Sequence, residues 1–167
     1  HTAIRRQRQM CIRDSDSFEG LPPIEDLDKE GEDFKKGMYS CSEQSFLDNL
    51  KNSGVDTKKV KTIPGWYSNT CTLDTLEKYN LRKASVIWID CDLYSSTKEV
   101  LQLVTHLIQD GTVLIFDDWF SFKGSPFRGE QKAFSEWISS PEIKNKFVFN
   151  EYQNCLLYTS PSPRDIS

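Results

Sequence analysis

Cysteine, basic residues and long apolar runs are scarce in this sequence, and each shortage excludes a class of protein. The five cysteines among 167 residues show no metal-ligand spacing, so neither a disulfide framework nor a zinc site is expected. No apolar run approaches the roughly 20 residues that a membrane span needs. Acidic side chains outnumber basic ones by 25 to 21, which argues against nucleic acid and anionic membranes as partners.

Both ends of the chain differ from its middle. Residues 5–15 are basic without an apolar period, and residues 155–165 are rich in Ser and Pro. With ordinary codons, the two runs back-translate to the two ends of a transposase-type sequencing adapter. We therefore interpret residues 1–15 and 155–167 as adapter-derived and residues 16–154 as a partial domain; the alternative is a basic arm and a Pro/Ser tail.

Excluding the flanks changes the composition. The remaining segment has 16 basic and 23 acidic side chains, a net charge near −7, and three cysteines without metal-type spacing. Such cysteines indicate a reducing compartment, so we expect a cytoplasmic protein. We also expect the two flanks to pack against nothing specific, because their composition was not selected to fit the core. The oligomeric state is not predicted.

The middle of the chain alternates between helical and strand patterns. An acidic stretch around Gly31 is typical of a solvated loop or lid. Capping-box patterns begin at Ser40, with Ser42 as an alternative N-cap, and at Ser96. The expected helices contain Phe46–Leu50, Leu73–Leu81, Val100–Ile108 and Ala133–Ile138, and the expected strands contain Val60–Ile63, Val86–Ile89, Val113–Phe116 and Phe147–Phe149.

This alternation predicts an α/β fold with a mostly parallel sheet covered by helices on both sides. The run Val86-Ile87-Trp88-Ile89 has no polar residue, which is typical of a strand buried on both faces. The crossover connections between parallel strands should be right-handed.

Acidic residues follow two of the expected strands directly. Asp90 and Asp92 come after Val86–Ile89, and Asp117-Asp118 comes after Val113–Phe116. Ligands of parallel sheets bind at the carboxyl ends of the strands, and all-oxygen ligands suit Mg²⁺, Ca²⁺ or Mn²⁺. We expect Asp90 and the Asp117-Asp118 pair to converge on a metal site, with Asp92 pointing away toward the helix near Ser96.

Four ordered motifs carry a family resemblance. They are Asp16-Ser17-Phe18-Glu19-Gly20-Leu21-Pro22, Pro64-Gly65-Trp66-Tyr67-Ser68-Asn69-Thr70, Ile89-Asp90-Cys91-Asp92-Leu93-Tyr94-Ser95-Ser96-Thr97 and Phe116-Asp117-Asp118-Trp119. In this order the segment 16–153 resembles the macrocin O-methyltransferase family, class I methyltransferases that use S-adenosylmethionine and Mg²⁺. The resemblance implies a partial Rossmann-like sheet whose first strand and Gly-rich cofactor loop are absent, so we expect the chain as given to be inactive.

The resemblance also implies roles for individual residues. Asp16 would accept hydrogen bonds from the cofactor ribose, with Ser17 and Phe18 beside it, and Ser42 would lie near the cofactor or serve only as a helix cap. The turn at Gly65 and Trp66 would pass close to the adenine, although a Trp is also a common core residue. The family's Mg²⁺ ligands match Asp90, Asp117 and Asp118.

The expected reaction transfers the methyl group of S-adenosylmethionine to a hydroxyl of a sugar or other diol-bearing small molecule, with Mg²⁺ assisting. The family's general base, a histidine, has no counterpart between Ser42 and Gly65, and His106 is expected at the surface, so no base is assigned. One alternative is a nucleotide-sugar transferase that uses Asp90-Cys91-Asp92 to hold a metal. Another is a non-catalytic domain on the same fold.

Overall fold

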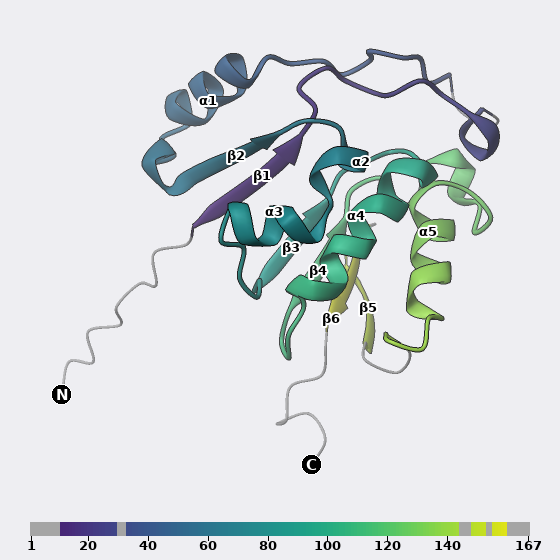
Figure 1. Ribbon diagram of the computed structural model, residues 1–167. Helices are drawn as coiled ribbons and strands as arrows, with labels where there is room; N and C mark the ends of the chain where they lie inside the picture. The colour runs from purple at the N-terminus through teal and green to yellow at the C-terminus, as the bar shows by residue number, and fades with distance from the viewer. Residues whose placement is uncertain (1–10, 30–32, 144–147, 153–154, 160–167) are drawn as a thin grey trace.

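The computed structural model describes residues 11–29, 33–143, 148–152 and 155–159, and its elements follow one another as an α/β chain (Figure 1). The strands are β1 (Ile12–Asp16), β2 (Val60–Pro64), β3 (Val86–Ile89), β4 (Val113–Phe116), β5 (Val148–Tyr152) and β6 (Cys155–Thr159). The helices are α1 (Glu43–Asn52), α2 (Tyr67–Thr70), α3 (Leu73–Lys78), α4 (Tyr94–Leu107) and α5 (Gly129–Ile138), with 3-10 turns η1 (Asp26–Asp28), η2 (Thr57–Lys59) and η3 (Phe122–Gly124).

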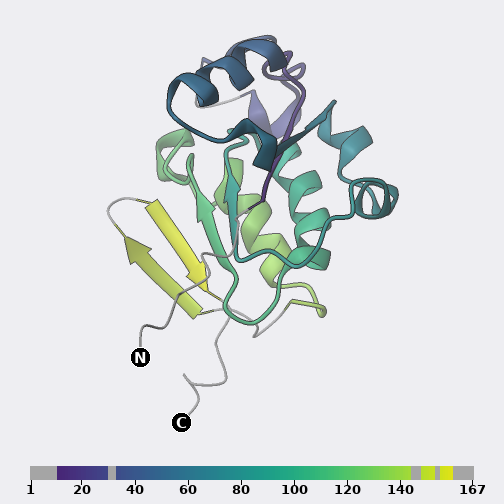
Figure 2. The same ribbon diagram turned by 90° about the vertical axis from the view of Figure 1, so that its left-hand side faces the viewer.

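The described strands form two sheets. β1 and β2 pair in parallel as a two-stranded sheet, and the second sheet has the order β3-β4-β6-β5. Within the second sheet β3 and β4 are parallel, whereas β6 is antiparallel to both β4 and β5. Figure 2 shows this sheet running from β3 and β4 into the β5–β6 hairpin. The expected parallel pairing is therefore confirmed for β1 with β2 and for β3 with β4, whereas β5 and β6 add antiparallel pairs.

The expectation that the flanks pack against nothing specific is wrong for two short stretches. Ile12–Asp16 is hydrogen-bonded in register with Val60–Pro64, and Cys155–Thr159 pairs with both β4 and β5. An open strand edge offers backbone groups that any sequence can pair with, and the side chain of Ile12 is still 40% exposed. Backbone pairing does not depend on the origin of the side chains, so the adapter-derived flanks stay a proposal.

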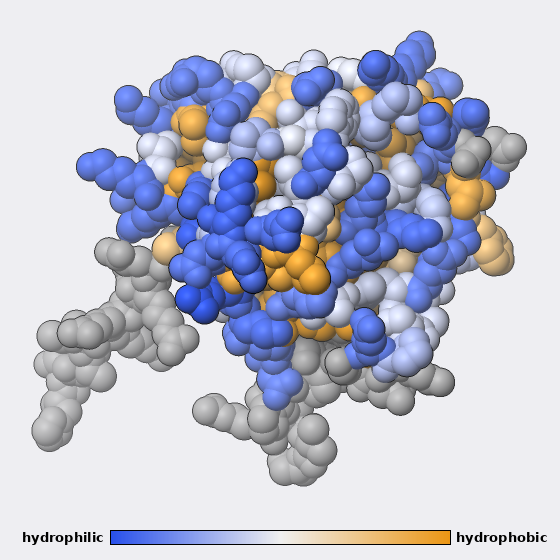
Figure 3. Space-filling model, viewed as in Figure 1, coloured by the Kyte–Doolittle hydropathy of each residue, from blue (hydrophilic) through white to orange (hydrophobic). Residues whose placement is uncertain are grey.

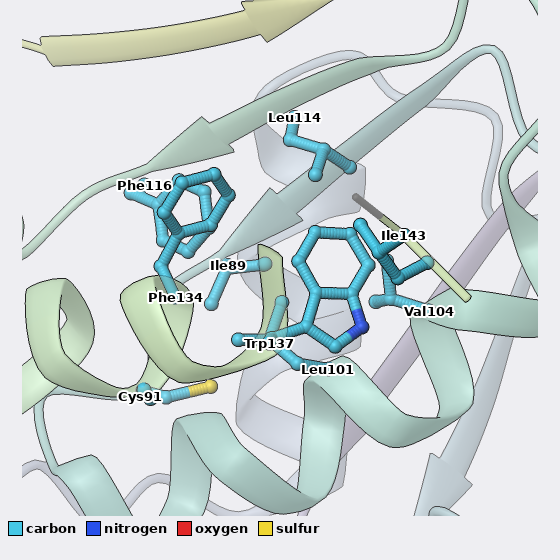
Figure 4. Close-up of a cluster of buried hydrophobic side chains, with 10 residues drawn as sticks. Ile89, Cys91, Leu101, Val104, Leu114, Phe116, Phe134, Trp137 and Ile143 are labelled. Atoms are coloured by element: carbon cyan, nitrogen blue, oxygen red, sulfur yellow. The ribbon is translucent and has the colours of Figure 1, made fainter. Parts of the chain in front are cut away.

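One hydrophobic core lies between the β3–β4 pair and helices α4 and α5 (Figure 4). Leu114 and Phe116 of β4 are fully buried, and the ring of Phe134 meets that of Phe116 edge-on with centroids 5.3 Å apart. Trp137 also packs in this core, and its indole N–H donates to Thr105 Oγ1 at 2.8 Å. The predicted helix faces of α4 and α5 are confirmed by this packing.

Strand β3 departs from the expectation of burial on both faces. Ile89 is buried on the side of α4 and α5, but Val86 and Trp88 are 50% and 61% exposed. Side chains of a strand alternate between its two faces, and no helix among the described residues covers the face of Val86 and Trp88. An uninterrupted apolar run thus marks a strand with one covered and one open face here.

Two helix starts test the capping patterns. Ser42 caps α1, since its Oγ accepts from Ser45 N–H at 3.1 Å. The capping box at Ser96 is wrong, because α4 already begins at Tyr94 and Ser96 lies buried inside it.

None of the described helices has the length and apolar character needed to span a bilayer. On the face shown in Figure 3, apolar side chains form small separate patches within a mainly hydrophilic surface.

Candidate metal and cofactor site

The ends of β3 and β4 bring the two acidic groups to one edge of the sheet. Ile89 lies opposite Phe116 in the parallel register, and Asp117 N–H donates to Ile89 O at 3.0 Å, just beyond the paired residues. The chains of Asp90 and Asp117 therefore leave the sheet side by side. This is the juxtaposition that the sequence predicts for strand ends in a parallel sheet.

Three carboxylates converge at this edge, and one of them was not expected. Oxygens of Asp90, Asp92 and Asp118 all lie within 4.8 Å of one another. Asp117 is exposed and lies outside this group. The prediction is therefore confirmed for Asp90 and Asp118 as neighbours, whereas the prediction that Asp92 points away from them is wrong.

A tight turn explains the direction of Asp92. Leu93 N–H donates to Cys91 O at 2.5 Å, and Asp92 between them has a φ of 54°. Asp and Asn enter this left-handed region more readily than other side chains that carry a Cβ. The turn keeps the carboxylate of Asp92 beside Asp90 and leaves the capping of α4 to another residue.

Burial and mutual repulsion raise the pKa values of these acids. Burial raises the pKa of Asp90 to about 6, with Asp118 and Asp117 adding to the shift. Burial followed by the charges of Asp118 and Asp90 raises the pKa of Asp92 to about 7. The pKa of Asp118 is also raised by burial, although a hydrogen bond from Ser121 opposes the shift. A cation among these carboxylates would remove the repulsion that disfavours their ionised forms.

Glu130, at the start of α5, is a site neighbour that the sequence analysis missed. It is 1% exposed, and its Oε2 accepts from Asp118 N–H at 3.1 Å. Its Oε1 is buried without a hydrogen-bond partner among the described residues. Burial, then Asp118 and Asp90, raises the pKa of Glu130 to about 9, while the backbone amides of Cys91 and Asp118 act in the opposite direction.

A large hollow adjoins the carboxylates and lies between β1 and β3. Its volume is about 1230 Å³, and its lining includes Asp16, Ser17, Trp66, Asp90 and Asp118. These residues come from both sheets, so three of the proposed cofactor contacts and two of the proposed metal ligands share one cavity. In the described residues β1 and β3 each pair with a strand on one side only, which leaves their other edges facing the hollow.

The remaining predicted cofactor residues do not line the hollow. The N–H of Gly65 donates to Asp16 O at 2.9 Å, which joins two of the predicted segments. Its φ of 136° suits glycine. Phe18 lies against the ring of Phe46 with centroids 5.8 Å apart, and Ser42 is exposed as the cap of α1.

No histidine stands beside the carboxylates in the described part of the chain. His106 is exposed, as expected, in the last turn of α4, at the end of the helix that lies away from the acidic cluster. Tyr67 is half-buried and lines the hollow, and desolvation keeps its pKa well above the ordinary value. His106 is too far from the cluster and Tyr67 retains its proton at neutral pH, so the proton-accepting side chains beside the cluster in the described part of the chain are carboxylates.

Comparison with known proteins identifies the family of the chain. The model of the family Macrocin-O-methyltransferase (TylF) matches residues 2–144. The chain belongs to this family. The matched region begins within the N-terminal flank and includes all residues of the acidic cluster.

Two curated relatives agree with the assignment. Demethyldecarbamoylnovobiocin O-methyltransferase of Streptomyces niveus is 28% identical over 117 residues, 67% of this chain and 43% of the relative. A tetracenomycin-C 4'-O-methyltransferase of Streptomyces olivaceus, named for a dimethoxy-rhamnosyl substrate, is 28% identical over 110 residues, 63% of this chain and 40% of the relative. The chain thus spans about two fifths of the length of these relatives.

Solved structures show the same fold. The O-methyltransferase NovP has a TM-score of 0.66 at 20% identity, over 90% of this chain and 60% of its own. The calicheamicin methyltransferase CalS11 has a TM-score of 0.69 at 19% identity, over 89% and 59% of the two chains. The expected partial Rossmann-like methyltransferase fold is therefore confirmed, and the family match speaks against the nucleotide-sugar transferase considered from Asp90-Cys91-Asp92 alone.

Proposed function

We propose that the complete protein transfers the methyl group of S-adenosylmethionine to a sugar hydroxyl of a small molecule, with a divalent cation assisting. The observation that carries this proposal is the convergence of Asp90, Asp92 and Asp118 beside a hollow that also contains Asp16. Family membership and the names of both curated relatives support the reaction class. The free thiols of Cys41, Cys71 and Cys91 fit a reducing compartment such as the cytoplasm.

The part of the hollow beyond the ends of β1 and β3, lined by Asp16, Asp90 and Asp118, is suited to the cofactor. Its acidic wall would favour a positively charged sulfonium, and Asp16 at the end of β1 is placed to accept hydrogen bonds from ribose hydroxyls. Ser17 is turned toward its own loop, because its Oγ donates to Gly20 O at 3.1 Å and accepts from Glu19 N–H at 3.0 Å. We therefore propose Asp16 and Trp66 as direct contacts, with Ser17, Phe18 and Gly65 shaping the loops and Ser42 acting as a cap.

The carboxylate cluster fits a hard divalent cation such as Mg²⁺. Carboxylate oxygens are its preferred protein ligands, at about 2.0–2.1 Å, and a separation within 4.8 Å needs only small side-chain rotations to reach that geometry. Asp90 and Asp118 would hold the ion. Two candidates for the third position lie beside them, namely Asp92 within the group and exposed Asp117 next to Asp118.

The acidic residues of the cluster would have separate roles in the reaction. A bound cation would lower the pKa of a chelated hydroxyl and fix its direction. Asp90 and Asp118 would set the acceptor hydroxyl at the mouth of the hollow, in line with the methyl group, where correct positioning supplies much of the rate. Whichever of Asp92 and Asp117 stays outside the coordination shell is placed to accept the hydroxyl proton.

Calorimetry on the complete protein tests the cofactor and the metal separately. S-adenosylhomocysteine should bind and UDP-sugars should not. Asp90→Asn should abolish Mg²⁺-dependent turnover and leave S-adenosylhomocysteine affinity almost unchanged, because the cation directs the acceptor rather than the sulfonium. Loss of cofactor affinity in step with turnover would instead make Asp90 a cofactor ligand.

Two matched variants assign the third position. Of Asp92→Asn and Asp117→Asn, the variant that weakens Mg²⁺ binding as strongly as Asp118→Asn removes the third ligand. The other should retain the metal and lose turnover. If both variants keep full metal affinity, the cation is held by other groups and the proposed ligand set is wrong.

A further inference from the structure

Asp28 is a buried carboxylate that belongs to no part of the proposed reaction. It is 2% exposed and lies in η1, within the acidic stretch that the sequence marks as a solvated loop. Its Oδ1 accepts from Tyr94 N–H at 2.7 Å, and its Oδ2 accepts from Ser95 N–H at 3.2 Å and from Ser95 Oγ at 2.8 Å. Asp28 thus accepts three hydrogen bonds from Tyr94 and Ser95, which lie 66 and 67 positions further along the chain. This is a specific long-range contact.

The residues that Asp28 holds come directly after the tight turn of the acidic cluster. Tyr94 is the first residue of α4. The N–H groups in the first turn of a helix have no partner within the helix and carry the positive end of its dipole, which favours a carboxylate. Two residues before Tyr94, Asp92 has a φ of 54°. A residue with a side chain persists in that region only where its surroundings fix it. The contacts of Asp28 provide such a constraint.

A small apolar cluster packs beside the residues that Asp28 contacts. Leu93, between Asp92 and Tyr94, is fully buried in a small cluster with Leu21 and Phe122, which is separate from the main core. Residues 37 and 38 are joined to Leu21 beside the cluster, since Leu21 N–H donates to Met38 O and Gly37 N–H donates to Leu21 O, both at 2.9 Å. In Figure 1 residues 17–29, in purple, run from the end of β1 across to the start of α4.

We propose that Asp28 is a positioning residue whose carboxylate fixes the Cys91-Asp92-Leu93 turn and so aims Asp92 into the acidic cluster. The predicted effect on metal binding rests on the proposed metal site. The hydrogen bonds by which Asp28 fixes the turn do not require a metal. The proposal also gives residues 17–29 a role, because they connect the proposed ribose acceptor Asp16 with the metal-binding edge of the sheet.

Hydrogen exchange measures the hold on the turn directly. Asp28→Asn keeps the size of the side chain but replaces one accepting oxygen by an NH₂ group, so one backbone donor loses its partner. The amides of Tyr94 and Ser95 should then exchange faster, whereas Leu114 in the main core should exchange as before. Glu25→Gln is the matched control, because Glu25 is an exposed acid in the same segment. Unchanged exchange at Tyr94 and Ser95 in Asp28→Asn overturns the proposal.

Manganese binding to this chain, followed by electron paramagnetic resonance, tests the consequence for the cluster. With Asp92 as the third ligand, Asp28→Asn should weaken Mn²⁺ binding about tenfold, at the lower end of what outer-shell partners of metal ligands contribute, and Glu25→Gln should not. In an Asp92→Asn background Asp28→Asn should weaken binding no further, since Asp28 acts through Asp92. Additive losses would show that Asp28 acts by another route and refute the aiming role.

Hydrogen exchange and Mn²⁺ binding test the role of Asp28 and the proposed metal site separately. A wild-type chain that binds no Mn²⁺ at this edge defeats the proposed metal site, and hydrogen exchange alone then decides whether Asp28 fixes the turn. A chain that binds Mn²⁺ equally well in wild type and in Asp28→Asn, with faster exchange at Tyr94, supports the hold on the turn but overturns the aiming of Asp92.

Discussion

The buried side chain of Glu130 should make the free energy of unfolding depend on pH. It lies on the face of α5 that also carries Ala133, Phe134 and Trp137, and it is the deepest carboxyl group of the site. Its ordinary pKa of 4.5 rises to about 9, first through burial and then through the charge of Asp118. Replacing it by Gln puts a permanently neutral side chain of the same shape in its place.

The sign follows from proton binding. Between pH 4.5 and 9 the folded protein binds a proton at Glu130 that the unfolded chain has released, so the free energy of unfolding falls as pH rises through this window. The limiting slope is about 1.4 kcal/mol per pH unit, so the wild type should lose at most about 3 kcal/mol relative to Glu130→Gln between pH 5.5 and 7.5. Asp90 and Asp92 titrate in both proteins, and their contributions largely cancel in the difference.

Urea unfolding at several pH values, followed by tryptophan fluorescence, measures this difference. The buried amide that Glu130→Gln introduces adds a cost of about 1–3 kcal/mol for unpaired donors, but this offset does not change with pH. Glu136→Gln is the control on the same helix: hydrogen bonding to Lys132 lowers the pKa of Glu136, so its stabilising contribution is lost only at acidic pH. Parallel pH profiles for wild type and Glu130→Gln would refute the reasoning, because Glu130 would then be ionised in the folded protein throughout.

Three further predictions follow from single contacts. Leu101→Ala should lower the free energy of unfolding by about 2–5 kcal/mol, since Leu101 is 1% exposed in the main core; a loss below about 1 kcal/mol in urea unfolding would mean that this core is loosely packed. Ser42→Ala should cost about 1 kcal/mol as a lost cap and leave S-adenosylhomocysteine affinity of the complete protein unchanged, so a calorimetric loss of affinity would make Ser42 a cofactor contact. Gly65→Ala should destabilise the protein by more than about 1 kcal/mol, because its φ is 136° and a Cβ would meet Thr70 Cγ2 at 3.0 Å; an unchanged thermal midpoint would contradict this.

Much of the fold follows from local patterns in the sequence. The short segment Val60–Ile63 and the apolar runs Val86–Ile89 and Val113–Phe116 are all strands. Short β-branched or apolar segments between turn residues pack well in a sheet. Asp90 and Asp118 are neighbours because a parallel crossover returns the second strand beside the first. Both inferences use only the period of side chains and the direction of strands, which short segments determine.

The errors come from contacts between distant segments. The direction of Asp92 depends on a positive φ that Leu93 and Asp28 stabilise from elsewhere, and no local pattern marks it. Burial of Val86 and Trp88 depends on whether a helix covers their face, which an apolar run does not determine. Glu130 was within reach of sequence reasoning, since helical spacing places it on the face of Ala133 and Phe134.

The two strand-end turns that carry the acidic cluster are each held by a buried carboxylate outside it. Asp28 accepts from the start of α4, after the turn of Asp92, and Glu130 accepts from Asp118 N–H, in the turn after β4. The sheet sets only where each turn begins, because beyond its last paired residue a strand no longer constrains the chain. The backbone of Asp92 and Asp118 is fixed by contacts to η1 and α5, so the spacing of the cluster depends on how these two elements dock. Substitutions at Asp28 and Glu130 should therefore change metal affinity more than substitutions within β3 or β4 that preserve the pairing.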